Sequence, residues 1–241
     1  MTLELVTIAC RTDNYAYLLH DAASGHTVLI DAPEAAPILA ALAARRWTLH
    51  DILITHHHDD HIAGTAALVA ATGARVAGAA ADAHRLPALD RMVRDADTFA
   101  IGPETAHVLE TPGHTVGHVC FYLPDSGYAF TADTLMAAGC GRLFEGTPAQ
   151  MHASLTRLKV LPPETLICSG HEYTTANLAF AATVDAGNAA LQTRIDATAA
   201  ARAAGRPTVP ATLALELATN PFLRAPDLAA FTALRAAKDR F

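Results

Sequence analysis

The hydrophobic pattern over the first two-thirds of the chain alternates short β-type runs with longer Ala- and Leu-rich runs. Short apolar and β-branched runs bounded by turn residues are typical of strands, and they occur at 3–8, 15–19, 27–30, 52–54, 119–123, 128–131 and 165–168. Helical patterns lie between them at 35–45, 62–71 and 148–160. This alternation predicts an α/β layered domain.

The helix predicted at 148–160 has a defined start. Thr147 can cap it, Pro148 suits the first helical position, and Gln150 completes a capping box.

After Gly170 the strand pattern stops and helical patterns follow at 176–184, 189–204, 213–218 and 227–238. The stretch 205–210 is the one Pro- and Gly-rich break in this part of the sequence. We therefore expect an α/β domain over residues 1–170 and a small all-helical domain over residues 171–241.

The net charge of the chain and its hydropathy limit the kinds of binding partner that are expected. Lys and Arg number 17 against 24 Asp and Glu, a formal net charge of -7, which argues against nucleic-acid binding through positive potential. No uninterrupted apolar stretch is long enough to span a bilayer, so no membrane partner is expected. The first residues lack the basic start of a secretory signal.

The four cysteines, Cys10, Cys120, Cys140 and Cys168, are far apart in sequence and form no close pair. They are interpreted as reduced thiols of a cytoplasmic protein, expected to be a monomer.

The 13 histidines include a cluster directly after the apolar run 52–54. Alternate side chains of an extended segment point the same way, so His56 and His58 face one side together. Asp60 and His61 follow where the chain turns into a helix and can face a second point nearby. His57 and Asp59 should point away, and the four remaining side chains can serve two cations.

Three later segments each add one ligand. His114 follows a Thr-Pro-Gly turn, Asp133 ends a strand with a carboxylate that can bridge two metals, and His171 ends the last strand. Strand ends at one edge of a sheet are where sites in such folds usually lie. Together these segments predict one metal constellation.

The run 55–61 matches the H-x-H-x-D-H signature of the metallo-β-lactamase superfamily. More narrowly, the sequence resembles the hydroxyacylglutathione hydrolase family over nearly its full length. The segments that carry this resemblance are Asp-Asn-Tyr at 13–15, Gly-Cys-Gly-Arg at 139–142 with Phe-Glu-Gly-Thr-Pro at 144–148, Gly-His-Glu-Tyr-Thr at 170–174, Ala-Thr-Asn-Pro-Phe at 218–222, and the ending 235–241.

The resemblance implies a four-layer αββα sandwich followed by the small helical domain. It implies two divalent metal ions, with zinc as the expected metal and iron or manganese as alternatives. In this assignment one ion is held by His56, His58 and His114, the other by Asp60, His61 and His171, and Asp133 bridges them. Asp60 and Asp133 are the implied catalytic residues.

The resemblance also implies a glutathione site made by Arg142, Phe144, Tyr173, Arg235 and Lys238. Glutathione is anionic, so an acidic protein needs local cations to bind it. Arg235 and Lys238 share a helix face, although by themselves they would be interpreted as a solvated helix end.

Three residues depart from the family pattern: Ala132 where Gly is common, Phe144 where some members have Tyr, and Arg142 where Lys also occurs. None of them is a predicted metal ligand.

The predicted reaction is hydrolysis of S-(2-hydroxyacyl)glutathione, typically the lactoyl compound, by a metal-bridging hydroxide, as the second step of methylglyoxal detoxification. A thioester suits such a site because a thiolate, with a thiol pKa of about 8.5, leaves without a strong acid. His118 either orients a ligand or simply packs, and the sequence leaves both open.

The main alternative in the same fold is an iron-dependent glutathione persulfide dioxygenase. Retention of both Asp60 and His171 with Arg235 and Lys238 favours the hydrolase. A nucleic-acid processing enzyme is disfavoured by the net charge of -7. A binding module with only structural metal is disfavoured because structural zinc sites close with four ligands.

Overall fold

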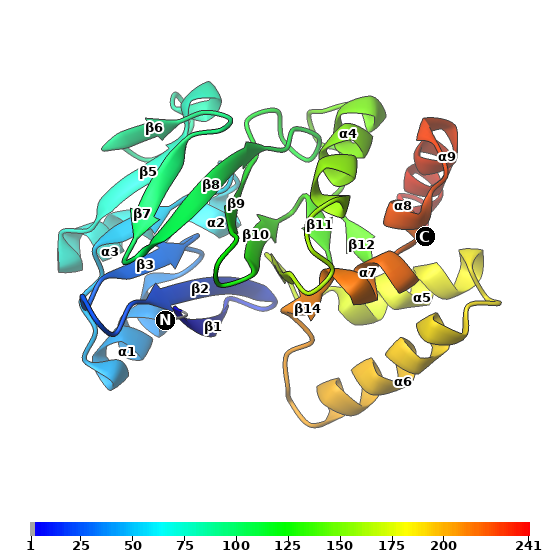
Figure 1. The fold of residues 1–241 in the computed structure, drawn as a ribbon, viewed down its shortest axis with the longest axis horizontal. Coiled ribbons are helices and arrows are strands. Elements are labelled where there is room, and N and C mark those ends of the chain that lie inside the picture. The colour runs from blue at the N-terminus through cyan, green and yellow to red at the C-terminus, as the bar shows by residue number, and fades with distance from the viewer. Residues whose placement is uncertain (1–2) are drawn as a thin grey trace. The chain divides into compact units, whose positions relative to one another are not determined.

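The computed structural model describes residues 3–241, which form two compact units (Figure 1). Unit 1 comprises the chain up to Glu110 together with Gly117–Ser126. Unit 2 comprises Thr111–Val116 and Gly127–Phe241.

Unit 1 contains a six-stranded sheet in the order β1-β2-β3-β4-β5-β6. The first three strands are antiparallel and β3 to β6 run parallel. The strands are β1 (Glu4–Cys10), β2 (Asn14–His20), β3 (Thr27–Ile30), β4 (Asp51–Leu53), β5 (Arg75–Ala79) and β6 (Arg91–Val93). Because β3 and β4 are parallel neighbours, the segments after them, starting at Asp31 and at Ile54, leave the same edge of the sheet.

Helices α1 (Ala35–Arg45) and α3 (Thr65–Thr72) bury their apolar side chains in the core of this sheet. Ile38 and Leu42 of α1 and Leu68 of α3 share one cluster with Leu29 and Ile52 of the strands. Each fully buried aliphatic side chain of this size contributes about 1.5–3 kcal/mol. Short turns α2 (Asp59–Ile62) and η1 (Ala80–Asp82) complete the helical part of unit 1.

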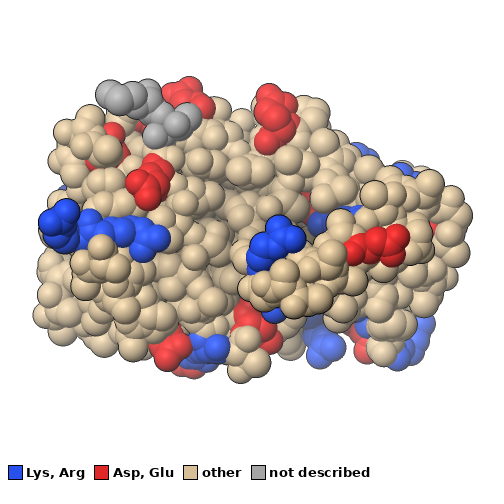
Figure 2. Space-filling model, turned by 90° about the horizontal axis from the view of Figure 1, so that it is seen from below, with Lys and Arg blue, Asp and Glu red and all other residues tan. Residues whose placement is uncertain are grey.

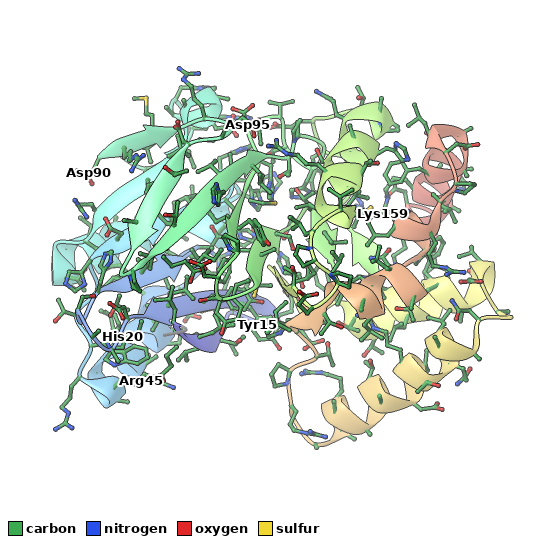
Figure 3. The ribbon with its side chains drawn as sticks, viewed as in Figure 1. Tyr15, His20, Arg45, Asp90, Asp95 and Lys159 are labelled. Carbon is green, nitrogen blue, oxygen red and sulfur yellow. The ribbon has the colours of Figure 1, made fainter. Side chains whose placement is uncertain are left out.

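Three antiparallel strands also belong to unit 1: β7 (Thr98–Ile101), β8 (Glu104–Glu110) and β9 (Val119–Leu123). At the surface of this unit, the His20 ring stacks on Trp47 at 4.1 Å, and the Arg45 guanidinium lies 5.5 Å from the same ring (Figure 3).

Unit 2 contains β10 (Tyr128–Ala132), β13 (Leu166–Ser169), β14 (Ala211–Thr212) and a hairpin of β11 (Leu135–Met136) and β12 (Gly139–Cys140). β13 pairs parallel with β10 and antiparallel with β14. The β10 register shifts between Phe130 and Ala132, and Ala132 has a φ of 39°. That conformation favours glycine, which is the physical reason for the glycine expected there from the family pattern.

The helices of unit 2 are α4 (Pro148–Lys159), α5 (Thr174–Val184), α6 (Ala189–Ala203), α7 (Leu213–Thr219), α8 (Pro221–Arg224) and α9 (Leu228–Lys238). The capping box predicted for α4 is confirmed, with Thr147 and Gln150 satisfying each other's backbone groups. The Lys159 ammonium donates to the Leu223 carbonyl at 2.8 Å and so ties α4 to α8 (Figure 3).

The predicted strands and helices are present within a few residues, but β5 to β8, β11, β12, β14 and the short helix α8 were not predicted, and one predicted helix is divided. The helix predicted at 62–71 is divided into α2 and α3 at Gly64, where a Cβ would lie 2.8 Å from the Ala35 nitrogen. β5 was not predicted because its sequence, rich in Ala and Gly, has a weak strand pattern. β14 adds a two-residue strand to the segment predicted to be all-helical.

Within residues 3–241, no helix is both long enough and apolar enough to cross a membrane. On the face drawn in Figure 2, basic and acidic side chains of the described residues are scattered among uncharged ones. All four cysteines are buried thiols that form no disulfide within residues 3–241. Burial raises the pKa of Cys10 to about 12 and of Cys140 to about 11, so both are protonated thiols at neutral pH.

Candidate metal centre

The candidate ligands of unit 1 follow β4 directly. Ile52 and Leu53 are core residues of that strand, and the chain then continues through the histidine run into α2. His56 and His61 are fully buried, whereas His58 is half-buried at the N-cap of α2. A buried imidazole needs hydrogen-bond partners for its ring nitrogens, and these partners fix its orientation.

Asp31, directly after β3, orients this run. One carboxylate oxygen accepts from the Thr55 amide at 2.8 Å, and the other accepts from the Thr55 hydroxyl at 2.8 Å. The second oxygen also lies 2.8 Å from His61 Nδ1. Because an ionised carboxylate only accepts, Nδ1 carries the hydrogen and Nε2 of His61 keeps a lone pair suited to a metal.

The same logic fixes His56. The Thr55 hydroxyl gives its hydrogen to Asp31, so it accepts from His56 Nδ1 at 3.0 Å. His56 Nε2 therefore carries the lone pair, and it lies 3.1 Å from His58 Nδ1. The buried His118 ring stacks on His56 with ring centroids 4.9 Å apart, so it packs directly against a predicted ligand.

Asp60 is held by Asn14 at the start of β2. The Asn14 amide donates to the Asp60 carboxylate and to the Asp60 carbonyl, both at 3.0 Å. Asp60 Oδ2 lies 3.9 Å from His61 Nε2.

The two remaining polar residues of the run have other partners. His57 Nδ1 lies 3.1 Å from the buried carboxylate of Asp82, and Asp59 pairs with Arg11 at 2.8 Å. Neither belongs to a group of side chains suited to hold a metal ion.

Unit 2 brings together its own three candidate ligands, which come from distant parts of the sequence. His114 follows the turn at Gly113, Asp133 follows β10, and His171 follows β13. Asp133 Oδ2 lies 3.4 Å from Nε2 of His114 and 3.4 Å from Nε2 of His171. All three side chains are buried.

These distances fit a cation better than direct hydrogen bonds. His114 Nδ1 lies 2.7 Å from the Arg142 carbonyl, which only accepts, so Nδ1 donates and Nε2 presents a lone pair toward the carboxylate. Two acceptors facing each other at 3.4 Å are repulsive unless a positive charge lies between them. Two ligands about 2.1 Å from one tetrahedral ion are about 3.4 Å apart, so the donor set fits a divalent metal.

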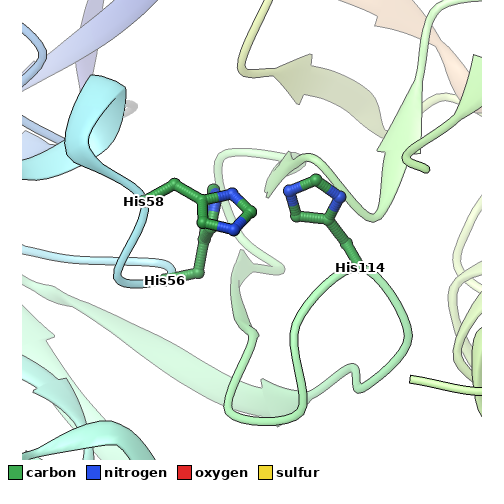
Figure 4. A group of neighbouring side chains, drawn as sticks. All are labelled: His56, His58 and His114. Atoms are coloured by element: carbon green, nitrogen blue, oxygen red, sulfur yellow. The ribbon is translucent and has the colours of Figure 1, made fainter. Parts of the chain in front are cut away.

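Three groups of side chains qualify as candidate metal ligands: His56, His58 and His114; His56, His61 and Asp133; and Asp60, His61 and His171. The ligand atoms within each group lie within 4.8 Å of one another, and Figure 4 shows the first group. Among residues 3–241, these groups contain the seven residues predicted from sequence and no other.

The residues predicted to bind substrate all lie in unit 2. Phe144 is 61% exposed and its ring meets His114 edge-on, with centroids 5.3 Å apart. Tyr173 stacks on His171 with centroids 4.6 Å apart and an interplanar angle of 7°. The Arg142 side chain is 60% exposed, and its Nε lies 3.6 Å from Asp239.

Arg235 and Lys238 on α9 differ in their accessibility. Arg235 is only 5% exposed, and it donates to the Cys140 carbonyl at 3.0 Å and to Asp239 at 2.8 Å. Lys238 is half-buried, and its ammonium donates to the Ala176 carbonyl at 3.1 Å. Burial, followed by repulsion from Arg235, lowers the pKa of Lys238.

Sequence reasoning missed the orienting residues Asp31 and Asn14. Asp31 had a usable signal, since an acidic residue directly after a buried strand is costly without a function or a partner. Asn14 belongs to the Asp-Asn-Tyr segment at 13–15, which carries the family resemblance, but the sequence alone indicated no role for its side chain.

Comparison with known proteins decides the family. Residues 12–171 match the metallo-beta-lactamase superfamily, and residues 172–241 match the hydroxyacylglutathione hydrolase C-terminus. A hydroxyacylglutathione hydrolase from Cereibacter sphaeroides is 62% identical over 229 residues, covering 95% of this chain and 90% of the relative. The chain belongs to the hydroxyacylglutathione hydrolase family.

Solved structures similar to this hydroxyacylglutathione hydrolase family member agree on the fold. ETHE1 from Myxococcus xanthus has a TM-score of 0.72 and 28% identity, covering 98% of this chain and 90% of that one. TTHA1623, solved in a di-iron-bound form, has a TM-score of 0.67 and 28% identity, and the match covers 91% of this chain and 100% of TTHA1623. The predicted fold class, a metallo-β-lactamase αββα fold with a helical C-terminal part, is confirmed.

Proposed function

We propose that this protein is a binuclear metal-dependent thioesterase that hydrolyses S-(2-hydroxyacyl)glutathione, such as S-lactoylglutathione, to glutathione and a 2-hydroxy acid. The observation that carries the proposal is the fixed direction of the ligand rings. His56, His61 and His114 each have Nδ1 tied to an oxygen, which leaves Nε2 available to a metal. Full-length relatives named hydroxyacylglutathione hydrolase support the substrate class.

The proposed ligand assignment follows the sequence. His56, His58 and His114 hold one ion, Asp60, His61 and His171 hold the other, and Asp133 serves both. Two divalent ions held in this way would supply an activated water and electrostatic stabilisation of the developing oxyanion.

The residues of the chain prepare this chemistry in advance. Asp31 and the Arg142 carbonyl keep the ligand rings in the required tautomer, so little reorganisation is needed on metal binding. Asn14 orients the Asp60 carboxylate by donating to it. Asp60 and Asp133 are the proposed catalytic carboxylates. The thiolate product leaves without a strong general acid, because its thiol has a pKa of about 8.5.

Residues 171–241 are proposed to form the glutathione-binding domain, with residues 1–170 as the catalytic domain. Arg142 and Lys238 supply accessible positive charge for the glutathione carboxylates, and Phe144 and Tyr173 supply exposed aromatic surface beside His114 and His171. Arg235 is proposed to contribute mainly by holding Asp239 and Cys140, because its guanidinium is buried against them.

Zinc is the proposed metal, with iron and manganese as alternatives, since His and Asp sites accept all three. The di-iron form of TTHA1623 supports iron as a serious alternative. We also propose that the protein acts in the cytoplasm as a monomer. Its buried, protonated thiols are suited to a reducing compartment.

Elemental analysis of the purified protein combined with an S-lactoylglutathione hydrolysis assay tests the function. The proposal expects two metal ions per chain and thiol release without oxygen consumption. One iron per chain with oxygen uptake on glutathione persulfide, and no thioester hydrolysis, would replace the hydrolase with the persulfide dioxygenase.

A further inference from the structure

The hairpin of β11 and β12 links two groups that define the ligands of unit 2. Asp133 lies two residues before the hairpin, and Arg142, whose carbonyl accepts from His114, lies two residues after it. A Cβ on Gly141 would clash with the Asp133 carbonyl oxygen and would lie 2.9 Å from His114 Nδ1. The exit from the hairpin therefore passes directly against both ligands, and a shift of the hairpin would displace them.

Side chains of the C-terminal helical segments bind the backbone of this hairpin. The contacts are Asn177 to the Ala137 carbonyl at 3.0 Å, Asn220 to the Met136 and Gly139 carbonyls at 3.2 and 2.9 Å, Arg235 to the Cys140 carbonyl at 3.0 Å, and the Ala138 amide to Glu216 at 2.8 Å. Each residue from Met136 to Cys140 thus has a backbone group hydrogen-bonded to a side chain in the C-terminal helices or at their caps. Such contacts are expected where a turn must keep one conformation.

The backbone conformation of this turn is unfavourable without outside contacts. Ala138 has a φ of 55°, a left-handed conformation that is strained for a residue with a Cβ. Its amide donates to Glu216, which is fully buried and ion-paired through its other oxygen with Arg194. Arg194 also donates to Thr219 at 2.7 Å, so the buried charges are compensated and form a fixed anchor.

We propose that Asn220, with Glu216, is a positioning residue that holds the β11–β12 hairpin in its metal-binding shape before any metal arrives. This inference rests on the proposed metal site. It gives the C-terminal segment a second role beside substrate binding, because that segment sets the position of Asp133 and the tautomer of His114 through the hairpin.

The test variant is Asn220→Ser. Asn220 Oδ1 caps α8 by accepting from the Phe222 amide at 3.1 Å, and serine keeps an N-cap oxygen but loses the donor to the two hairpin carbonyls. The matched control is Asn188→Ser. Asn188 caps α6 by accepting from Leu191 at 3.2 Å, and its amide donates to Ala218 at 2.9 Å instead of to the hairpin.

Zinc affinity is measured for each protein by competition with a chromophoric chelator. Asn220→Ser should weaken zinc binding about 10–100-fold, the usual cost of losing a group that orients a ligand. Asn188→Ser should bind zinc like the wild type. Equal zinc affinity in wild type, Asn220→Ser and Asn188→Ser would overturn the inference, whereas a wild type that binds no zinc, iron or manganese would overturn the proposed function itself.

Amide hydrogen exchange on the metal-free wild type gives a second readout that does not depend on the variant folding. The inference expects the amides of residues 135–141 to exchange as slowly as those of α7 without metal. Fast exchange there that slows only on zinc binding would show that the metal organises the hairpin and would refute the inference. In Asn220→Ser, exchange should rise at 135–141 while α8 stays protected.

Discussion

The two units present their candidate metal ligands in different ways. In unit 1, His56, His58, Asp60 and His61 come from one run of six residues, and Asp31 from the neighbouring parallel strand orients that run. In unit 2, His114, Asp133 and His171 are separated by long stretches of sequence, and helices hold the hairpin between two of them. The first arrangement follows from local sequence, whereas the second exists only after many long-range contacts form.

This difference teaches where each arrangement is vulnerable. The run in unit 1 depends on one carboxylate that accepts from an amide, a hydroxyl and an imidazole. The ligands of unit 2 depend on several weaker backbone contacts spread over the C-terminal helices. In unit 1, replacing the single orienting carboxylate should therefore weaken metal binding strongly. In unit 2, the loss should be shared among several substitutions in the C-terminal helices.

The largest effect is expected for Asp133→Ala. This carboxylate lies 3.4 Å from both His114 and His171, so its loss removes the one group shared by the proposed ions. Turnover should fall by more than about 10³-fold, beyond the cost of a single electrostatic donor, and bound metal should drop below two per chain. Thioester hydrolysis rates and elemental analysis check this. Near-normal activity with two bound metals would exclude the bridging role.

A smaller but distinct effect is expected for Asp31→Asn. The amide would present a hydrogen toward His61 Nδ1 or leave the Thr55 donors unsatisfied, so the ring tautomer is no longer fixed. Metal affinity should fall about 10–100-fold. The control is Asp59→Asn, because Asp59 is exposed and pairs only with Arg11 in the contacts described. If both variants bound zinc equally well, the orienting role of Asp31 would be wrong.

Lys238→Ala should change substrate affinity rather than metal binding. Loss of a half-buried cation facing an anionic substrate should raise KM about fivefold, corresponding to about 1 kcal/mol, with kcat little changed. Lys159→Ala is the control, because its ammonium also donates to a carbonyl in unit 2. Steady-state kinetics decide, and an unchanged KM in Lys238→Ala would remove this residue from the substrate site.

The pH dependence sharpens the same prediction. Burial and Arg235 lower the pKa of Lys238, so the lysine loses its proton, and its positive charge, at a lower pH than an ordinary lysine. KM of the wild type should therefore rise as the pH increases toward the alkaline range, and Lys238→Ala should lack this rise. A rise of equal size in both proteins would assign it to another group.

The smallest effect is expected for Thr147→Ala at the start of α4. Its hydroxyl accepts from the Gln150 amide at 3.2 Å, and losing such a cap costs about 1 kcal/mol. The free energy of unfolding should fall by that amount, measured by denaturant titration, while metal affinity stays unchanged. A loss of metal affinity would mean that the helix end, and not only the hairpin, controls the ligands of unit 2.

Much of the fold could be predicted because its signals are local. The strand 27–30 and the helix 35–45 have the predicted bounds, since a continuous apolar run, an Ala- and Leu-rich run and the turn residues between them set these bounds. β5 and the hairpin strands β11 and β12 were not predicted, because their small residues form strands only through pairing and side-chain contacts far away in sequence.

The family, the fold class and the identity of the candidate ligands could be predicted from residue types and their spacing, because ligand chemistry depends directly on both. The orientation of the ligands, and the groups that hold them, depend on the three-dimensional packing. Asp31, Asn14 and Asn220 act through hydrogen bonds to atoms far away in sequence, and no local pattern encodes such a contact. Tertiary packing likewise decided that Arg235 is buried while Lys238 stays accessible, although the two share a helix face.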